Sequence, residues 1–233
     1  MFFIIFLSAF IIQSTVCHNS DSSALLDEPP SRSSAYRFFF KTLPNDKDGY
    51  LNCGGFDTQW GVNGGKCGVC GDPYNGARDN ELPYGKYTKD LTVTRTYKSG
   101  STIYAKVHMI KNNGGHFEFR LCPATALLNN ETIRQEPHDW VQEVTDQCLD
   151  SHRLEVLGST DGNRWCWPIP DRQQQGVIYQ IKVKLPQGLR CERCVFQWTW
   201  VTADNYGWCS DGTWKLGCGP QTTHKACADV QII

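Results

Sequence analysis

Cysteine is the residue of this 233-residue chain with the most evident chemistry, because twelve are present and four of them form C-x-x-C pairs. The pairs are Cys67-Gly-Val-Cys70 and Cys191-Glu-Arg-Cys194. In a cytosolic protein such pairs indicate a zinc site or a thiol redox centre. More than 120 residues separate the two pairs here, whereas about 15–20 residues separate the pairs of a zinc ribbon. Structural disulfides, formed in an oxidising compartment, therefore explain the pairs better.

The N-terminal segment predicts that compartment. Met1–Ile12 is apolar without a charged side chain, and Thr15 and Cys17 are small enough for the −3 and −1 positions of a cleavage site. The run is shorter than the roughly 20 residues that span a membrane, so it predicts a secretory signal peptide over residues 1–17. We therefore expect a secreted, extracellular protein whose mature chain begins at His18. Removal of Cys17 leaves eleven cysteines, so one thiol must be free or pair between chains.

Composition narrows the range of partners. The formal charge is −1, from 23 basic and 24 acidic side chains, which gives no electrostatic footprint for nucleic acid or an anionic membrane. Hydrophobic residues make up 40% of the chain and charged residues 20%, as in an ordinary globular domain. No internal repeat and no linker-like tract divides the chain. We expect an N-terminal arm over residues 18–28 and one domain over residues 29–233.

Predicted strands dominate the chain after residue 90, so any functional site must be positioned by them. Five segments alternate apolar with polar side chains and are bounded by Gly, Pro, Asn or Asp: 91–96, 102–109, 117–121, 177–184 and 196–200. Such runs are typical of half-buried antiparallel strands. With short turns between the strands, the pattern predicts an all-β fold, an antiparallel β-sandwich.

The segment 31–87 has no convincing alternation and contains three cysteines. It predicts a long, disulfide-pinned loop region packed against the sandwich, with a helical turn within 31–40. A second helical turn is expected within 126–148. Asn130 begins an Asn-Glu-Thr glycosylation acceptor, which suits a loop of a secreted protein.

Aromatic residues divide into two groups. Trp198 and Trp200 alternate with polar residues in a predicted strand, so we assign them to the core. Tyr36, Trp60 and Tyr74 lie in the loop region and are the candidates for stacking on sugar rings, although covering the sandwich is the commoner use of such side chains.

Eight segments in order resemble one protein family: Pro29-Pro-Ser-Arg-Ser-Ser34, Cys53-Gly-Gly-Phe56, Gly64-Gly-Lys-Cys-Gly-Val-Cys-Gly-Asp72, Gly85-Lys-Tyr87, Gly115-His-Phe-Glu-Phe-Arg-Leu-Cys-Pro123, Cys194-Val-Phe-Gln-Trp-Thr-Trp200, Gly217-Cys-Gly-Pro-Gln221 and Ala226-Cys-Ala-Asp229. The family is the type-4 chitin-binding domain proteins of animals and oomycetes, classed as auxiliary-activity family fifteen of the lytic polysaccharide monooxygenases. The resemblance extends from about Pro29 to Ile233. It implies an immunoglobulin-like β-sandwich, a copper cofactor, and oxidative cleavage of an insoluble polysaccharide, chitin or in some members cellulose.

The resemblance also implies how copper is held. In the family, the mature N-terminal His supplies its α-amino and imidazole nitrogens, and a second His completes a brace of three nitrogens, donors that suit copper. Asn113 stands where that second His is expected, and a neutral amide is a far weaker ligand than imidazole. His224 takes the position of an axial aromatic residue.

The N-terminus departs from the family as well. His18 is the expected first residue of the mature chain, but ten residues separate it from Pro29. Ser22 or Ser23 falls where the family has its N-terminal His.

Three functions remain open. A decayed brace, which we prefer, leaves a secreted polysaccharide-binding protein without copper. A rearranged site would bring His18 close to His224 or His116 and keep an active copper monooxygenase. A structural protein of a secreted matrix is the third possibility.

The resemblance assigns ten cysteines to five disulfides: Cys53, Cys67, Cys70, Cys122, Cys148, Cys191, Cys194, Cys209, Cys218 and Cys227. Cys166, in Trp165-Cys-Trp167, lies where the family usually has no cysteine. We therefore predict that Cys166 is the odd thiol, buried between its tryptophans.

Overall fold

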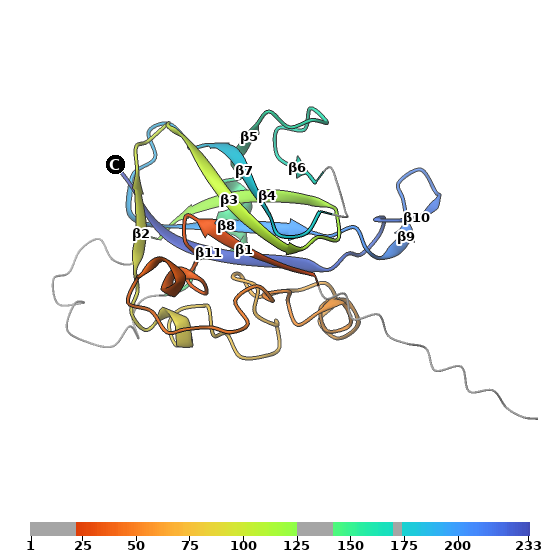
Figure 1. Ribbon diagram of the computed structural model, residues 1–233, viewed down its shortest axis with the longest axis horizontal. Helices are drawn as coiled ribbons and strands as arrows, with labels where there is room; N and C mark the ends of the chain where they lie inside the picture. The colour runs from red at the N-terminus through yellow and green to blue at the C-terminus, as the bar shows by residue number, and fades with distance from the viewer. Residues whose placement is uncertain (1–21, 125–141, 170–173) are drawn as a thin grey trace, which may run out of the picture.

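Two β-sheets packed face to face form the body of the protein (Figure 1). The computed structural model describes residues 22–124, 142–169 and 174–233. The first sheet has the order β1-β3-β7-β5, with β1 (Ser23–Glu28), β3 (Thr102–Lys111), β7 (Val177–Lys184) and β5 (Glu155–Leu157). The second has the order β2-β11-β8-β4-β6, with β2 (Val93–Tyr97), β11 (Thr223–Ile232), β8 (Cys191–Val201), β4 (His116–Pro123) and β6 (Trp167–Pro168). Neighbouring strands are antiparallel except for β2 and β11, which confirms the predicted all-β sandwich.

The remaining elements are short. A separate two-stranded ribbon projects from one end of the sandwich and consists of β9 (Tyr206–Trp208) and β10 (Trp214–Leu216). The helical segments are η1 (Ala35–Phe38), the π-helical η2 (Asp57–Val62), η3 (Lys86–Thr88) and α1 (Asp146–Ser151). Within the described residues, no helix has the length and apolarity needed to cross a membrane.

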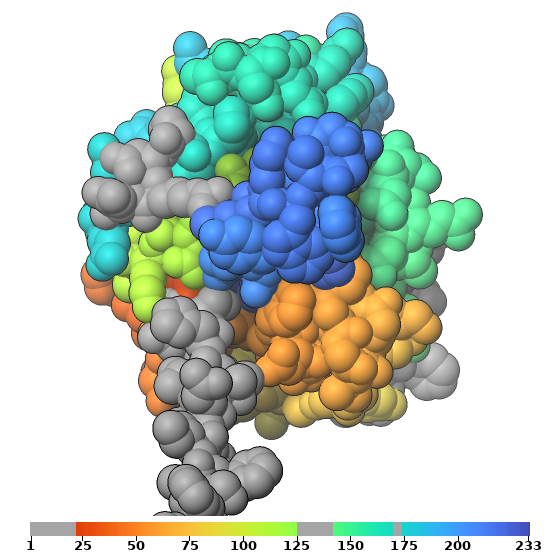
Figure 2. Space-filling model, turned by 90° about the vertical axis from the view of Figure 1, so that its right-hand side faces the viewer, coloured from red at the N-terminus to blue at the C-terminus, as the bar shows by residue number. Residues whose placement is uncertain are grey.

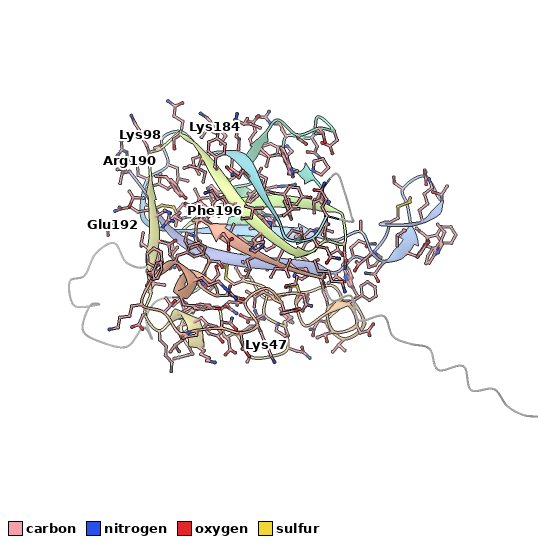
Figure 3. All side chains as sticks on the ribbon, viewed as in Figure 1. Lys47, Lys98, Lys184, Arg190, Glu192 and Phe196 are labelled. Carbon is pink, nitrogen blue, oxygen red and sulfur yellow. A yellow bond between two sulfur atoms is a disulfide. The ribbon has the colours of Figure 1, made fainter. Side chains whose placement is uncertain are left out.

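Alternating side chains of both sheets fill the core. On β3 the inward residues are Ile103, Ala105, Val107 and Met109, each at most 6% exposed. Phe117 of β4 packs against Trp198 and Trp200 of β8, with ring centroids 5.6 and 6.4 Å apart. The assignment of both tryptophans to the core is confirmed, and Figure 3 places Phe196 of the same strand in the interior as well.

The central strand β8 is buried on both faces. Gln197 and Thr199 alternate with the core tryptophans, yet they are only 1% and 4% exposed. The loop region 31–87 lies along the outer face of this sheet, below β8 and β11 in Figure 1. Gln197 Nε2 donates a hydrogen bond to the carbonyl oxygen of Val69, 2.7 Å away, in that region. The polar outer face of β8 is therefore the binding surface for the loops.

A buried ion cluster and a disulfide attach the loop region to β11. Arg32 donates through Nε to Asp229 at 2.7 Å and through Nη1 to Glu143 at 2.6 Å. Arg193 of β8 lies 2.9 Å from the second oxygen of Asp229. The Cys70–Cys227 disulfide joins the same two segments across 157 residues of sequence.

The described residues contain five disulfides: Cys53–Cys67, Cys70–Cys227, Cys122–Cys148, Cys191–Cys194 and Cys209–Cys218. The two C-x-x-C pairs are therefore parts of disulfides. Cys166 is the free cysteine of the described residues and is half-buried, and the flanking Trp165 is 38% exposed. The expected burial of this thiol between its tryptophans is thus wrong.

Several local predictions also differ from the structure. β11 was not among the predicted strands, although Asp229 and Gln231 alternate there with Ala228, Val230 and Ile232, and eight of its ten residues are buried. On β2 the expected faces are inverted: Thr94 is 7% exposed and bonds to the carbonyl oxygen of Pro30, whereas Val93 is 41% exposed. The predicted helical turn at 31–40 is present as η1. Most of the second predicted turn, and Asn130, lie outside the described residues.

Candidate functional site

One end of the sandwich gathers the positions at which the family resemblance places the copper ligands. Ser22 precedes β1, Asn113 lies in the turn between β3 and β4, and His224 is near the start of β11. Ser23 pairs with Lys111 across the first sheet, and His224 pairs with Trp200 across the second. These pairings bring three segments distant in sequence to the same end of the fold.

His224 is a core residue. It is 1% exposed, and its ring stacks on the indole of Trp200 with centroids 4.7 Å apart. Its Nε2 lies 2.7 Å from the hydroxyl oxygen of Ser22, and within the described residues its Nδ1 has no hydrogen-bond partner. Burial lowers the pKa of His224 to about 3. The imidazole is therefore neutral at physiological pH, and its one bonded nitrogen is used by Ser22.

Asn113 is fixed in a network of polar side chains. Its side-chain Nδ2 donates to Asp204 Oδ2 at 2.8 Å, and its backbone carbonyl oxygen accepts from the backbone nitrogen of Ala203 at 3.2 Å. The other oxygen of Asp204 accepts from Thr202 Oγ1 at 2.5 Å. The amide of Asn113 is thus held as a hydrogen-bond donor toward a carboxylate.

His116 lies on the opposite face of the sheet from His224. Trp200 is the pairing partner of both His224 and Phe117, so these three side chains share the core face. Successive residues of a strand point to opposite faces, and His116, which precedes Phe117, therefore points outward. Its Nε2 lies 3.3 Å from Glu118 Oε1. His116 and His224 cannot ligate the same ion, and His18 lies outside the described residues.

Glu118 is the centre of a polar cluster on that outer face. Arg120 Nη2 lies 2.7 Å from Oε2 of Glu118, and Arg153 Nη2 lies 3.5 Å from Oε1. Burial by itself raises the pKa of Glu118, but hydrogen bonding to His116 and the two guanidinium charges outweigh it and lower the pKa to about 2. The nearby Cys166 is affected in the other direction, since burial and the charge of Glu118 raise the pKa of its thiol to about 11.

A groove of about 600 Å³ runs along the outer face of the second sheet beside this cluster. Trp60 and Tyr74 line it, together with Glu118 and Arg120. Trp60 belongs to η2, and its indole nitrogen donates a hydrogen bond to the carbonyl oxygen of Gln221 at 2.9 Å, which holds the ring in place. The structure thus brings two of the three predicted sugar-stacking residues to one groove.

Tyr36, the third, is elsewhere. Its hydroxyl donates toward the carbonyl oxygen of Asn45 at 3.0 Å and lies 3.2 Å from Asp48 Oδ2. Tyr36 does not line the groove that holds Trp60 and Tyr74, and its contacts tie η1 to the following loop.

The β9–β10 ribbon carries an aromatic surface that was not among the predicted sites. Tyr206, Trp208 and Trp214 are 62%, 67% and 55% exposed. Trp208 and Trp214 are cross-strand partners, and their rings meet edge to face at 5.3 Å. Tyr206 pairs with Leu216 in the same ribbon, so all four side chains share one face. We refer to Tyr206, Trp208, Trp214 and Leu216 as the aromatic ribbon face.

Close backbone packing on the other side of the ribbon explains this exposure. A Cβ added at Gly207 would lie 2.2 Å from the carbonyl oxygen of Cys218, so only glycine fits there. The Cys209–Cys218 disulfide closes the same loop. Tyr206 and Trp208 before Asp211-Gly212, and Trp214 and Leu216 after it, repeat at period two, and this is the sequence signal that could have revealed the ribbon.

The two ends of the sandwich differ in chemistry. Figure 2 shows the blue ribbon in the middle of one face, directly above the orange segment that contains η2. Figure 3 places Lys98, Lys184, Arg190 and Glu192 at the end opposite the ribbon, and all four are exposed. The exposed aromatic side chains of the ribbon therefore lie at the same end as His224 and Asn113.

Comparison with known proteins gives one matching family and two similar solved structures. The profile of a family described as lytic polysaccharide mono-oxygenase, cellulose-degrading, matches residues 24–230. A solved AA15 lytic polysaccharide monooxygenase from Thermobia domestica, in the Cu(I) state, is 40% identical with a TM-score of 0.76, over 90% of this chain and 98% of that one. A copper complex of the cellulose-active monooxygenase CelS2 is 17% identical with a TM-score of 0.45, over 89% of this chain and 97% of that one. No curated protein sequence matches.

Proposed function

Because this chain belongs to the lytic polysaccharide monooxygenase family, we propose that it is a secreted protein that binds an insoluble polysaccharide, chitin in the first place, without the copper brace of the family. The proposal has two parts, loss of the copper site and retention of a polysaccharide-binding face. Each part rests on a different group of side chains.

The donor set supports the first part. Within the described residues, the end of the sandwich that carries Asn113 offers one imidazole, His224, and that ring is buried against Trp200 with Nε2 bonded to Ser22. Asn113 presents an amide that already donates to Asp204. A copper brace needs several nitrogen donors around one open position. The described residues therefore do not fit copper, and we assign no step of a reaction to it.

The aromatic ribbon face is the single observation that carries the second part. Three aromatic side chains, each more than half exposed, are held on one face by a disulfide and by cross-strand pairing. Rigid aromatic side chains give a large contact area for little loss of conformational entropy, and an exposed patch of this kind marks a binding surface. A sugar polymer suits the patch, since its rings have apolar faces and its hydroxyl groups can reach the polar residues beside it.

Sedimentation with insoluble polysaccharide tests the proposal. The secreted protein should bind to chitin beads and, more weakly, to microcrystalline cellulose. Tyr206→Ala and Trp208→Ala should each lower the bound fraction at least fivefold. Tyr104→Ala is the matched control, because Tyr104 is 50% exposed on β3, which belongs to the first sheet and not to the ribbon.

Each outcome is informative. Equal binding of Tyr206→Ala and Tyr104→Ala would contradict the ribbon as the binding face. No binding to either polymer would instead favour a structural protein of a secreted matrix.

A further inference from the structure

We propose that His116, Glu118 and Cys166 form a zinc-binding site on the outer face of the second sheet. One ligand atom from each residue, an imidazole nitrogen, a carboxylate oxygen and the thiol sulfur, lies within 4.8 Å of the other two. The site is separate from the Asn113–His224 end described above, because it lies on the other face of β4.

The sheet register brings the three side chains together. His116 and Glu118 are two residues apart on β4, so they share a face. β6 pairs with β4 through His116–Pro168 and Phe117–Trp167. Continuing this antiparallel register by one residue places Cys166 opposite Glu118. An imidazole, a carboxylate and a thiol are therefore presented from two adjacent strands.

The distances match those of zinc coordination. Nε2 of His116 is 3.3 Å from Oε1 of Glu118, and Sγ of Cys166 is 3.7 Å from the same oxygen. With Zn–N and Zn–O bonds of about 2.0 Å and a Zn–S bond of about 2.3 Å, tetrahedral ligands lie about 3.3 Å (N to O) and about 3.5 Å (S to O) apart. Small side-chain rotations are enough to direct all three atoms at one ion, with a water molecule in the fourth position.

The surrounding charges are compatible with a cation. A thiolate and a carboxylate together balance the charge of Zn²⁺. Arg120 bonds to the other oxygen of Glu118 and also to Asp150, at 3.0 Å. Arg153 makes only a 3.5 Å contact with Oε1 and is 39% exposed, so it can turn to solvent. Asp161 adds a further negative charge that acts on both His116 and Cys166.

The donor set favours zinc over the copper of the family. Thiolate with imidazole and carboxylate is a typical combination for zinc, whereas a brace of nitrogen donors suits copper. Coordination would also protect a half-exposed thiol from oxidation in an oxidising compartment.

Cobalt(II) spectroscopy of the secreted protein, freed of metal with a chelator, tests the site. One equivalent of Co²⁺ should give a near-ultraviolet thiolate-to-cobalt band and visible bands of tetrahedral intensity, and Zn²⁺ should abolish both. Cys166→Ser should remove the near-ultraviolet band, and His116→Gln should weaken Zn²⁺ binding at least tenfold. His108→Gln is the matched control. Its side chain is 36% exposed against 35% for His116, and it also faces a carboxylate, Asp27, at 3.8 Å.

The unsubstituted protein decides the matter even if a variant fails to fold, because a cobalt–thiolate band requires a free cysteine. Absence of that band at one equivalent would overturn the proposal and leave an ion-pair cluster around Glu118. Persistence of the band in folded Cys166→Ser, or an equal loss of affinity in His108→Gln, would also overturn it.

Discussion

The hydroxyl of Ser22 lies 2.7 Å from Nε2 of His224, and both side chains are fully buried at the end of the sandwich that also carries Asn113. Ser22 therefore occupies the imidazole nitrogen that points toward it. The polar side chains at this end of the sandwich bond to one another: Ser22 to His224, and Asn113 to Asp204.

The first prediction concerns the binding of Cu²⁺ at the end of the sandwich that carries Asn113 and His224. We expect the protein to bind Cu²⁺ weakly and to release no oxidised oligosaccharides from chitin or cellulose in the presence of a reductant. Calorimetry and product analysis by mass spectrometry check this expectation. Asn113→His should tighten Cu²⁺ binding, because imidazole replaces a weak amide donor.

Oxidised products from the unsubstituted protein would refute the loss of the brace. In that event His18→Ala should abolish them, whereas His116→Ala should not, because His116 is on the opposite face of the sheet from His224.

His224 should make folding stability depend on pH. Its pKa is about 3 in the folded protein and about 6.5 in the unfolded chain. Between these values the unfolded state binds the extra proton, so the stability is complete above the unfolded pKa and falls as the pH decreases below it. The expected loss is about 1.4 kcal/mol per pH unit well below pH 6.5.

Denaturant unfolding from about pH 4 to pH 7, with disulfides intact, measures this slope. His224→Phe should keep the stacking on Trp200 and remove the contribution. A stability difference between His224→Phe and the unsubstituted protein that stays constant with pH would contradict the assignment.

Gly115 should be intolerant of any side chain. Its φ is +93°, and an added Cβ would lie 1.9 Å from the carbonyl oxygen of Val201 in the adjacent strand. We expect Gly115→Ala to lower the free energy of unfolding by roughly 3 kcal/mol or more, from backbone strain together with overpacking. Gly158 has a φ of +80° with no atom within 4 Å of an added Cβ, so Gly158→Ala should cost only about 1 kcal/mol. Equal melting temperatures for the two variants would show that the clash is relieved.

The buried ion cluster should contribute strongly to stability. Asp229 is 1% exposed and bonds to both Arg32 and Arg193. Burial by itself raises the pKa of Asp229, but the two guanidinium groups outweigh it and lower the pKa. Asp229→Asn leaves two buried cations without a full counter-charge, and we expect a loss of about 3–5 kcal/mol.

Asp211→Asn is the matched substitution at the surface, where Asp211 and Lys215 are 58% and 60% exposed. Its expected cost is small, because an exposed ion pair contributes little to stability. Comparable losses of unfolding free energy in the two variants would be inconsistent with a stabilising cluster.

Local patterns in the sequence were sufficient for the architecture. The alternation in β3, β4, β7 and β8 predicted a sandwich, and it placed Trp198 and Trp200 in the core. Motif spacing was sufficient for the family. These features depend on period-two geometry and on residue order, which are properties of the chain itself.

The tertiary structure alone decided which faces are covered and which side chains meet. Gln197 looks like a solvated strand residue until the loop around Val69, more than 120 residues away in sequence, covers it. Cys166 comes to Glu118 through the pairing of β6 with β4, and Ser22 comes to His224 across 202 residues. Strand geometry alone makes neighbouring side chains point to opposite faces of the sheet. Which segment covers each face is decided only when segments distant in sequence pack together and exclude water.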